Sequence, residues 1–323
     1  MAGKRRIVYT ILYIIAALVT VTTIFVLLFG YNALLLFFVR KSFGDWPDRY
    51  VLLAAVETEN QTVRVLEFHV SDSGDLQPYS ERMYISADEG CSVHTMAVSQ
   101  AGVAYFSVLR ESLVRIKFFE GGNEKVVLPA SPVRVCLAND GSRVASLLST
   151  GMLVIHNLRT GAKKEIPLLK DARGSRTRVA CLQFCPSIST KLLVVIDAGD
   201  GCARLFVVDC EDGKWTSAVL RCRTSMGKAG WVSSTVVAVA EAKTLLVVRP
   251  NGQVFRKVVA PKSYCFWRIG AAVDGLLPVV LLARSKIRSR IVWILNSSGD
   301  VIVSRPIKYA SSLNELTLVR GGR

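Results

Sequence analysis

Few side chains in this sequence are suited to acid–base chemistry or to binding a transition metal. Its 323 residues include only three histidines, and none of them lies beside a pair of cysteines. The eight cysteines form no Cys-x-x-Cys pair, which is the spacing typical of structural zinc sites. We therefore expect no metal site and no other cofactor.

The motifs of nucleophilic catalysis and of phosphate binding are also missing. No serine stands in the G-x-S-x-G context of a nucleophile elbow, and the glycines lie in turns instead of at a strand-to-helix junction. Asp197, Asp200 and Asp209 are best explained as turn and strand-end residues. The sequence thus predicts that the chain is not an enzyme, although an enzyme or small-ligand-binding protein of hydrolase or lyase type stays open.

The cysteines are spaced like buried side chains of strands. Cys181 and Cys185 are four residues apart, so an extended chain places both on one face. Cys136 stands at the corresponding part of the preceding repeat described below. This pattern predicts thiols that pack as small apolar side chains. Disulfides stay open, because their pairing cannot be deduced from the sequence.

Charged side chains are absent from residues 7–39. A helix of about 20 apolar residues is long enough to cross a bilayer. We predict a transmembrane helix at residues 7–29, after a cytoplasmic N-terminus at residues 1–6 and before an interfacial segment and linker at residues 30–49. A cleaved signal peptide is the alternative, but its apolar part is shorter, at about 7–15 residues.

Basic residues flank this apolar run on both sides, at residues 4–6 and at Arg40, Lys41 and Arg49. Because the flank richer in lysine and arginine stays in the cytoplasm, the near balance gives only a preference. We expect the N-terminus in the cytoplasm and the large C-terminal domain on the other side. The inverted topology stays open.

Residues 50–323 alternate between short apolar runs and turn clusters such as Asp-Ser-Gly-Asp at 72–75 and Asn-Gly at 251–252. This alternation predicts an all-β domain of short strands. The segments that begin at Val93, Val133 and Arg178 repeat one order of strands and turns every 40–45 residues or so, which is about the period of a propeller blade.

Weaker copies of this repeat begin at Tyr50, Gly230 and Cys265. We therefore predict a β-propeller of about six four-stranded blades over residues 50–323, preceded by one transmembrane α-helix. The segment Leu-Asn-Glu-Leu-Thr-Leu-Val-Arg-Gly at 313–321 has strand character, and we expect it to pair with the first blade.

Two segments resemble WD-repeat propellers. FCPSISTKLLVVIDAGDGCARLFVVDCEDGK at 184–214 is similar to the second strand, Asp-Gly turn, third strand and next hairpin of that family, with Asp200-Gly201 at the turn. VIHNLRTGAKKEI at 154–166 resembles the third strand, Thr-Gly hairpin and fourth strand, with His156-Asn157 where Trp-Asp would stand. Trp-Asp and Gly-His are both absent from the sequence. The resemblance implies a degenerate WD-like propeller with broad faces that bind proteins.

The predicted domain is strongly basic. Residues 50–323 hold 35 of the 41 basic and 23 of the 25 acidic residues, a net charge of +12. Arg284, Lys286, Arg288 and Arg290 alternate along the chain, so they would share one face of an extended segment. Other basic residues fall in predicted connections between blades. The candidate basic interaction surface consists of Arg284, Lys286, Arg288, Arg290, Arg173, Arg176, Arg178, Arg221 and Arg223.

This surface could dock an acidic protein partner or anionic lipid headgroups, and a solvated edge hairpin that resists aggregation is the alternative. Nucleic acid is not expected as a partner, because base-stacking aromatic side chains are not interleaved with these charges.

These features together predict a single-pass membrane protein of the bacterial inner membrane with a periplasmic propeller. We expect it to be a protein–protein interaction scaffold in an envelope, secretion or motility complex. A propeller enzyme or small-ligand-binding protein is one alternative. A cytoplasmic-facing propeller that acts as an adaptor in trafficking or regulation is another.

Overall fold

The computed structural model describes residues 19–21, 23, 45–47, 49–57, 62–85, 93–107, 113–118, 122–130, 132–169, 178–225, 227–284, 289–307 and 312–320. The chain divides into two compact units, Met1–Ser42 and Phe43–Arg323. Of the predicted transmembrane segment 7–29, only residues 19–21 and 23 are described, and they are helical. No helix within the described residues is long and apolar enough to span a membrane.

The second unit is built from strands, as predicted. Its described residues form β1 (Tyr50–Glu57), β2 (Val63–Val70), β3 (Leu76–Ile85), β4 (Val93–Val98), β5 (Gly102–Ser107), β6 (Leu113–Phe118), β7 (Asn123–Val127), β8 (Pro132–Leu137), β9 (Arg143–Leu148), β10 (Met152–Asn157), β11 (Lys163–Pro167), β12 (Arg178–Cys185), β13 (Ile188–Asp197), β14 (Ala203–Asp209), β15 (Trp215–Leu220), β16 (Ala229–Ser233), β17 (Val236–Ala240), β18 (Thr244–Val248), β19 (Val254–Val259), β20 (Tyr264–Ile269), β21 (Leu277–Ala283), β22 (Arg290–Leu295), β23 (Val301–Ile307) and β24 (Ser312–Arg320).

These strands form antiparallel groups of four. Strands β4–β7, β8–β11, β12–β15 and β16–β19 make separate sheets in chain order. The remaining sheet has eight strands, in which β20–β23 adjoin β3, β2, β1 and β24 through one parallel pair, Ile307 and Leu76. The predicted repeat starts at Val93, Val133 and Arg178 fall within one residue of the first strands β4, β8 and β12.

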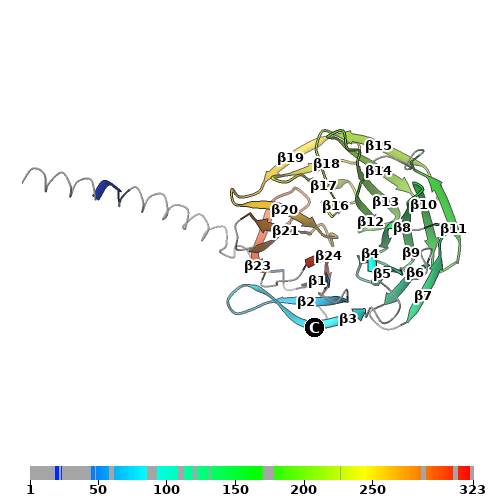
Figure 1. Cartoon of the computed structure of the whole chain (residues 1–323), viewed down its shortest axis with the longest axis horizontal. Coiled ribbons are helices and arrows are strands. Elements are labelled where there is room, and N and C mark those ends of the chain that lie inside the picture. Colours follow the sequence, from blue (N-terminus) through cyan, green and yellow to red (C-terminus); the bar gives the residue numbers. More distant parts are fainter. Residues whose placement is uncertain are drawn as a thin grey trace, which may run out of the picture. The chain divides into compact units, whose positions relative to one another are not determined.

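The innermost strands of successive groups contact one another. They are the first strands β4, β8, β12, β16 and β20 of five groups, together with β24. Strand β4 contacts β8, β8 contacts β12, and the series continues through β16, β20 and β24, which contacts β4. Figure 1 shows the groups following one another around a centre, with β7, β11, β15 and β19 on the outside. Strand β24 pairs with β1 from Tyr50–Arg320 to Glu57–Ser312. The predicted pairing of the C-terminal segment with the first group is thereby confirmed.

The core lies between neighbouring groups. Because each sheet packs on both of its faces, an inner strand can be apolar at successive positions instead of alternating. Residues 192–196 of β13 show this pattern, since all five are buried. On its two faces, β13 contributes Leu192, Val194 and Ile196 to one core cluster and Leu193 and Val195 to another.

Aspartate and asparagine side chains build many of the turns. In a turn of this kind, the side-chain oxygen accepts a hydrogen bond from the backbone N–H two residues later. Asp197 accepts from Gly199 at 3.0 Å, Asp200 from Cys202 at 3.0 Å, and Asp209 from Glu211 at 2.8 Å. The three aspartates thus have the turn role that the sequence predicts.

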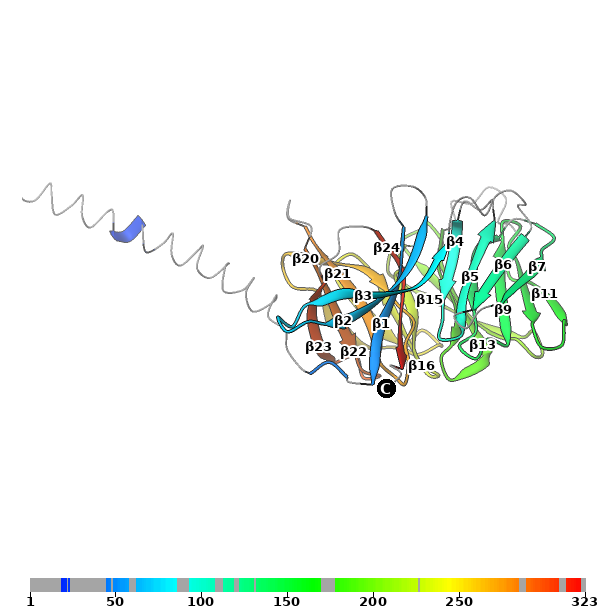
Figure 2. The ribbon, with the colours of Figure 1, turned by 90° about the horizontal axis from the view of Figure 1, so that it is seen from below.

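The turns lie on two faces, because antiparallel neighbours reverse direction. We call the face where Tyr50 begins β1 and Arg320 ends β24 the proximal face, and the opposite one the distal face. The Cys210 N–H donates to Thr190 O at 2.7 Å, which joins the proximal turn after β14 to the start of β13. The Arg284 N–H donates to Ser263 O at 2.8 Å, which joins two distal connections. Figure 2 shows the strands from the side, between these faces.

The end of the predicted linker 30–49 belongs to the second unit. Trp46 packs against the core cluster that includes β1 and β24. Its indole Nε1–H donates a hydrogen bond to Tyr50 O at 2.7 Å. The preceding residues 30–44 lie outside the described part of the chain.

Candidate functional site

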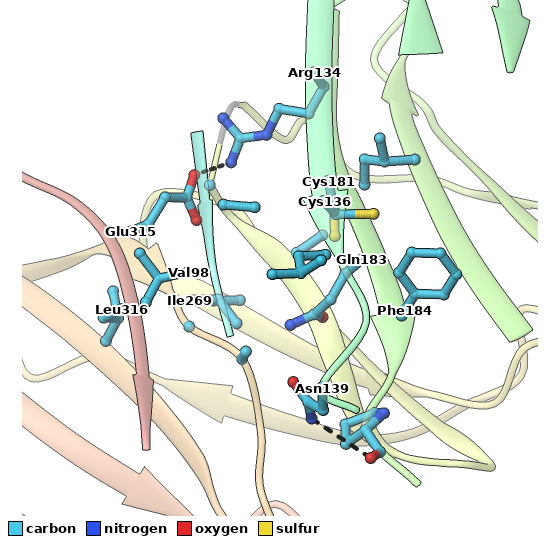
Figure 3. A pocket seen from close by; sticks show the side chains of 18 of the residues that line it. Val98, Arg134, Cys136, Asn139, Cys181, Gln183, Phe184, Ile269, Glu315 and Leu316 are labelled. Carbon is cyan, nitrogen blue, oxygen red and sulfur yellow. Dashed lines mark hydrogen bonds and ion pairs between the residues drawn. The ribbon is translucent and has the colours of Figure 1, made fainter. Parts of the chain in front are cut away.

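A small cavity of about 50 Å³ lies at the centre of the second unit. Its walls come from all six innermost strands, and they include Val98 of β4, Cys136 of β8 and Ile269 of β20. Figure 3 shows Arg134 of β8 and Glu315 of β24 joined across it. The side chains of this ion pair are 10% and 20% exposed. Charged groups therefore occupy part of the space that a ligand would need.

Glycine allows the inner backbones to approach each other closely around this cavity. A Cβ at Gly270 would lie 2.6 Å from Leu316 O and 2.9 Å from Pro278 Cγ. At Gly230 it would lie 3.0 Å from Gln183 Oε1, which accepts a hydrogen bond from the Trp231 backbone N–H at 2.7 Å. These contacts join β12, β16, β20 and β24 tightly.

The dimensions and chemistry of the cavity limit its use. Pockets for small molecules usually measure about 300–1,000 Å³, whereas a liquid water occupies about 30 Å³. The cavity can thus hold about one or two waters. Burial raises the pKa of Cys181 to about 12 and also raises that of Cys136. Both side chains are therefore neutral thiols near pH 7, and a thiol is a poor nucleophile.

Five of the nine predicted basic residues are described. Arg178, Arg221, Arg223 and Arg284 are exposed and belong to the distal face, at the start of β12, after β15 and after β21. The predicted positions Arg173, Arg176, Lys286 and Arg288 lie outside the described residues.

Arg290 departs from the prediction. Strand β21 ends at Ala283 and β22 begins at Arg290, so Arg284 and Arg290 belong to the ends of two different strands and do not share one extended face. Arg290 is only 8% exposed, and its guanidinium lies 4.7 Å from the ring centre of Trp267. Strand β22 also pairs on both sides, with β21 and β23. Arg290 is therefore not part of an exposed basic face, whereas Arg284 is exposed.

A larger open groove of about 1,110 Å³ lies on the proximal face. We call it the proximal groove. Turns of three neighbouring groups line it, with Lys191 at the start of β13, the turns on both sides of β17–β18, and the turn after β22. The lining residues are Lys191, Ser233, Ser234, Thr235, Val236, Arg249, Pro250, Asn251, Phe255, Arg256, Ser297 and Ser298.

The proximal groove is cationic and rich in hydroxyl groups. Lys191, Arg249 and Arg256 supply positive charge, and none of the described residues that line the groove has a carboxylate. Arg249 donates to the neutral Gln253 Oε1 at 3.1 Å. Arg256 forms an ion pair at 2.6 Å with Asp300, which lies beside the groove. Cations and hydroxyls in one concave site suit an oxyanion such as a carboxylate.

Sequence reasoning missed the proximal groove. Its three cations come from β13, the turn after β18, and β19, and Lys191 and Arg256 are 65 positions apart along the chain. The turns predicted at 251–252 and 297–300 form two of its walls. These turns lie side by side only because their groups are neighbours around the centre. The local pattern that we searched for, a dense basic run, is not present in the groove.

The described residues contain no cluster of three or more histidine, cysteine, aspartate or glutamate side chains that could hold a metal ion. No protein-family model matches the sequence. No curated protein matches it either.

Proposed function

We propose that residues 50–323 form a closed six-bladed β-propeller, tethered to a membrane by residues 7–29, which serves as a protein–protein interaction scaffold. The observation that carries this proposal is the contrast between its centre and its faces. The central cavity is about 50 Å³ and contains the Arg134–Glu315 pair, whereas basic and hydroxyl side chains are exposed on the turns. A central cavity this small favours binding of partners on the two faces over chemistry at the centre.

The pairing of β24 with β1 supports closure of the propeller. The C-terminal strand becomes the innermost strand of the group that the N-terminal strands β1–β3 begin. This pairing covers the inner edge that β1 would otherwise present to another chain. A closed ring is rigid, and rigid turns lose little conformational entropy when they bind a partner.

The distal face is the proposed docking surface for protein partners. Arg178, Arg221, Arg223 and Arg284 are exposed there, on the face opposite the one where β1 begins. Exposed cationic side chains on a rigid face complement an acidic protein surface, so we propose an acidic protein as the partner. We propose that this partner belongs to an envelope, secretion or motility complex.

The state of the cysteines favours a second candidate, a propeller adaptor in the cytoplasm. The seven cysteines within the described residues are all free, and five of them are buried. Persistent disulfides form in oxidising compartments and are rare in the cytosol, so free thiols fit a reducing environment. The two candidates have the same docking surface and differ in the side of the membrane on which it lies.

Crosslinking in native membranes tests the scaffold proposal. We would compare proteins crosslinked to the wild-type chain with those crosslinked to Arg221→Glu/Arg223→Glu. Arg159→Glu/Lys214→Glu is the matched control, because it changes the net charge equally at exposed residues of the proximal face. We expect the distal pair alone to lose specific partners. Identical partners for all three proteins would contradict the proposed docking surface.

Protease protection separates the two candidates. In sealed cells or spheroplasts, digestion of residues 50–323 from outside would support the exported scaffold. Protection that disappears on lysis would support the cytoplasmic adaptor.

A further inference from the structure

We propose that the proximal groove binds an extended acidic segment of a partner protein. The inference rests on the proposed function only in taking the ligand to be part of a protein. It adds a second site, on the face opposite the distal arginines, and assigns a chemistry to its ligand. Three features of the groove carry it: charge, shape and the acidic residues that surround it.

The charge of the groove is complementary to carboxylates. Lys191, Arg249 and Arg256 line one concavity, and no acidic side chain does so within the described chain. Asp300 compensates Arg256 only partly, because the two side chains are 46% and 43% exposed and solvent screens the attraction between them. Carboxylates of a ligand can therefore compete for Arg256 and pair with Arg249 and Lys191.

The shape of the groove fits an extended peptide. Its volume of about 1,110 Å³ exceeds that of most small-molecule pockets, which are about 300–1,000 Å³, and it is open along the turns of three groups. Phe255 is 45% exposed in its wall, and Pro250 lies in the preceding turn. These side chains offer an apolar contact between the cationic ones. An acidic segment that also carries an aromatic or aliphatic residue would use both.

Acidic residues elsewhere on the proximal face disfavour an anionic membrane as the occupant. Asp72 lies in the turn after β2, Asp140 in the turn after β8, and Glu211 and Asp212 in the turn after β14. Exposed cations such as Arg159 and Lys214 share this face, so a flat anionic surface would meet both signs of charge outside the groove and gain little there. A narrow peptide reaches only the groove, where the lining cations lie.

A fluorescent peptide tests this inference with the full chain in a neutral detergent. The probe is a fluorescein-labelled peptide of about ten glutamate and serine residues with one central phenylalanine, about 33 Å long when extended. Its charge-inverted counterpart, with lysine in place of glutamate, is the reference. Fluorescence anisotropy gives the Kd for wild type, Lys191→Glu/Arg249→Glu and Phe255→Ala. The control is Arg159→Glu/Lys163→Glu, whose exposed residues lie around the turn between β10 and β11, outside both the groove and the distal arginines.

We expect the acidic peptide to bind and its lysine counterpart not to bind. Reversal of two cations should raise the Kd about tenfold or more, because attraction becomes repulsion, and Phe255→Ala should raise it by a smaller factor. The Arg159→Glu/Lys163→Glu control should leave the Kd within about twofold of the wild type. Equal thermal denaturation midpoints for all variants exclude misfolding as the cause.

Three outcomes would overturn the inference. The peptide does not bind, its Kd changes equally in the groove variants and in Arg159→Glu/Lys163→Glu, or vesicles rich in phosphatidylserine bind through Lys191 and Arg249 while the peptide does not. In each case the scaffold proposal still stands if Arg221→Glu/Arg223→Glu loses partners in native membranes. Conversely, unchanged partners together with groove-dependent peptide binding would overturn the distal docking surface alone.

Discussion

At the scale of single residues, Arg134 and Glu315 provide the clearest test of the centre. Removing one partner of a buried ion pair leaves the other charge without compensation, which typically costs about 3–5 kcal/mol. We expect Glu315→Ala to lower the free energy of unfolding by about 3 kcal/mol, at the lower end because Glu315 is 20% exposed. The double variant Arg134→Met/Glu315→Leu should recover most of this loss.

Urea denaturation of the full chain in detergent measures both effects. If Glu315→Ala costs less than about 1 kcal/mol, the value of an ordinary surface pair, the two charges are not held together at the centre. A double variant as unstable as the single one would show that the cavity needs the charges for another reason.

Glu67 links stability to pH. It is 5% exposed and accepts hydrogen bonds from Arg82, from His69 Nε2 at 2.7 Å and from Ser80 Oγ at 3.2 Å. Burial alone would raise its pKa, but the hydrogen bonds from His69 and Arg82 outweigh burial and lower the pKa below 4.5. A carboxylate whose pKa is lowered by folding stabilises the folded state above its unfolded pKa, and this contribution disappears as the pH falls through the folded pKa.

We therefore expect Glu67→Gln to cost about 1–2 kcal/mol at about pH 6 and much less at about pH 3. Chemical denaturation at the two pH values, with Glu81→Gln as an exposed acidic control on the next strand, measures the difference. A cost that does not change with pH would mean that Glu67 contributes through packing and not through its charge.

The role of a residue could be predicted from the sequence where it depends only on neighbours along the chain. The turn roles of Asp197, Asp200 and Asp209 follow from a side chain reaching a backbone N–H two residues away, which needs no knowledge of the tertiary structure. The buried cysteines follow from apolar strand neighbours. Cys222 is different, because its flanking arginines indicate a polar loop, yet it is 4% exposed and packs in the core between β12–β15 and β16–β19.

At the scale of elements, the outer strands β15 and β19 expose apolar side chains. Each pairs on one side only within the described sheets, with β14 and β18. Val219 and Val259 are both 62% exposed, and Trp215, Val254 and Phe255 are at least 44% exposed. Exposed edges with apolar residues favour pairing with another chain.

We expect Val219→Lys/Val259→Lys to reduce self-association of the purified chain, because lysine on an edge strand opposes pairing. The free energy of unfolding should change by less than about 0.5 kcal/mol, since both side chains face solvent. Sedimentation velocity with Val219→Thr/Val259→Thr as the uncharged control measures the first effect. A loss of more than about 2 kcal/mol in urea denaturation would show that these valines are buried.

Strands were predicted well where apolar runs alternate with turn residues. The exposed basic face was predicted poorly, because it was inferred from the spacing of charged residues alone. Repeat starts such as Val93 and Arg178 coincide with strands because hydrophobic runs and turns specify them locally. Arg290 was misplaced because its stack on Trp267, a residue of β20, depends on pairing between strands. The proximal groove depends on the arrangement of three groups, which no local pattern records.

At the scale of the whole molecule, the account depends on closure of the ring by β24. The distal and proximal faces exist as continuous surfaces only if β24 joins the first group to the rest. Two observations support closure. The innermost strands contact one another in a cyclic series, and Tyr50–Glu57 pairs with Ser312–Arg320. The period of the repeat suggested this architecture, and the number of groups follows from the pairing of strands.

Disulfide trapping across β1 and β24 tests closure most directly. Val51 and Val319 are register partners, so Val51→Cys/Val319→Cys should form a disulfide under mild oxidation. In the control Val51→Cys/Leu318→Cys, the second cysteine is one residue out of register and points to the opposite face of the strand, so it should not. Mass spectrometry of tryptic peptides identifies the bond despite the native cysteines. Selective trapping of the first pair is the predicted result, whereas equal trapping of both pairs, or of neither, would contradict a closed ring.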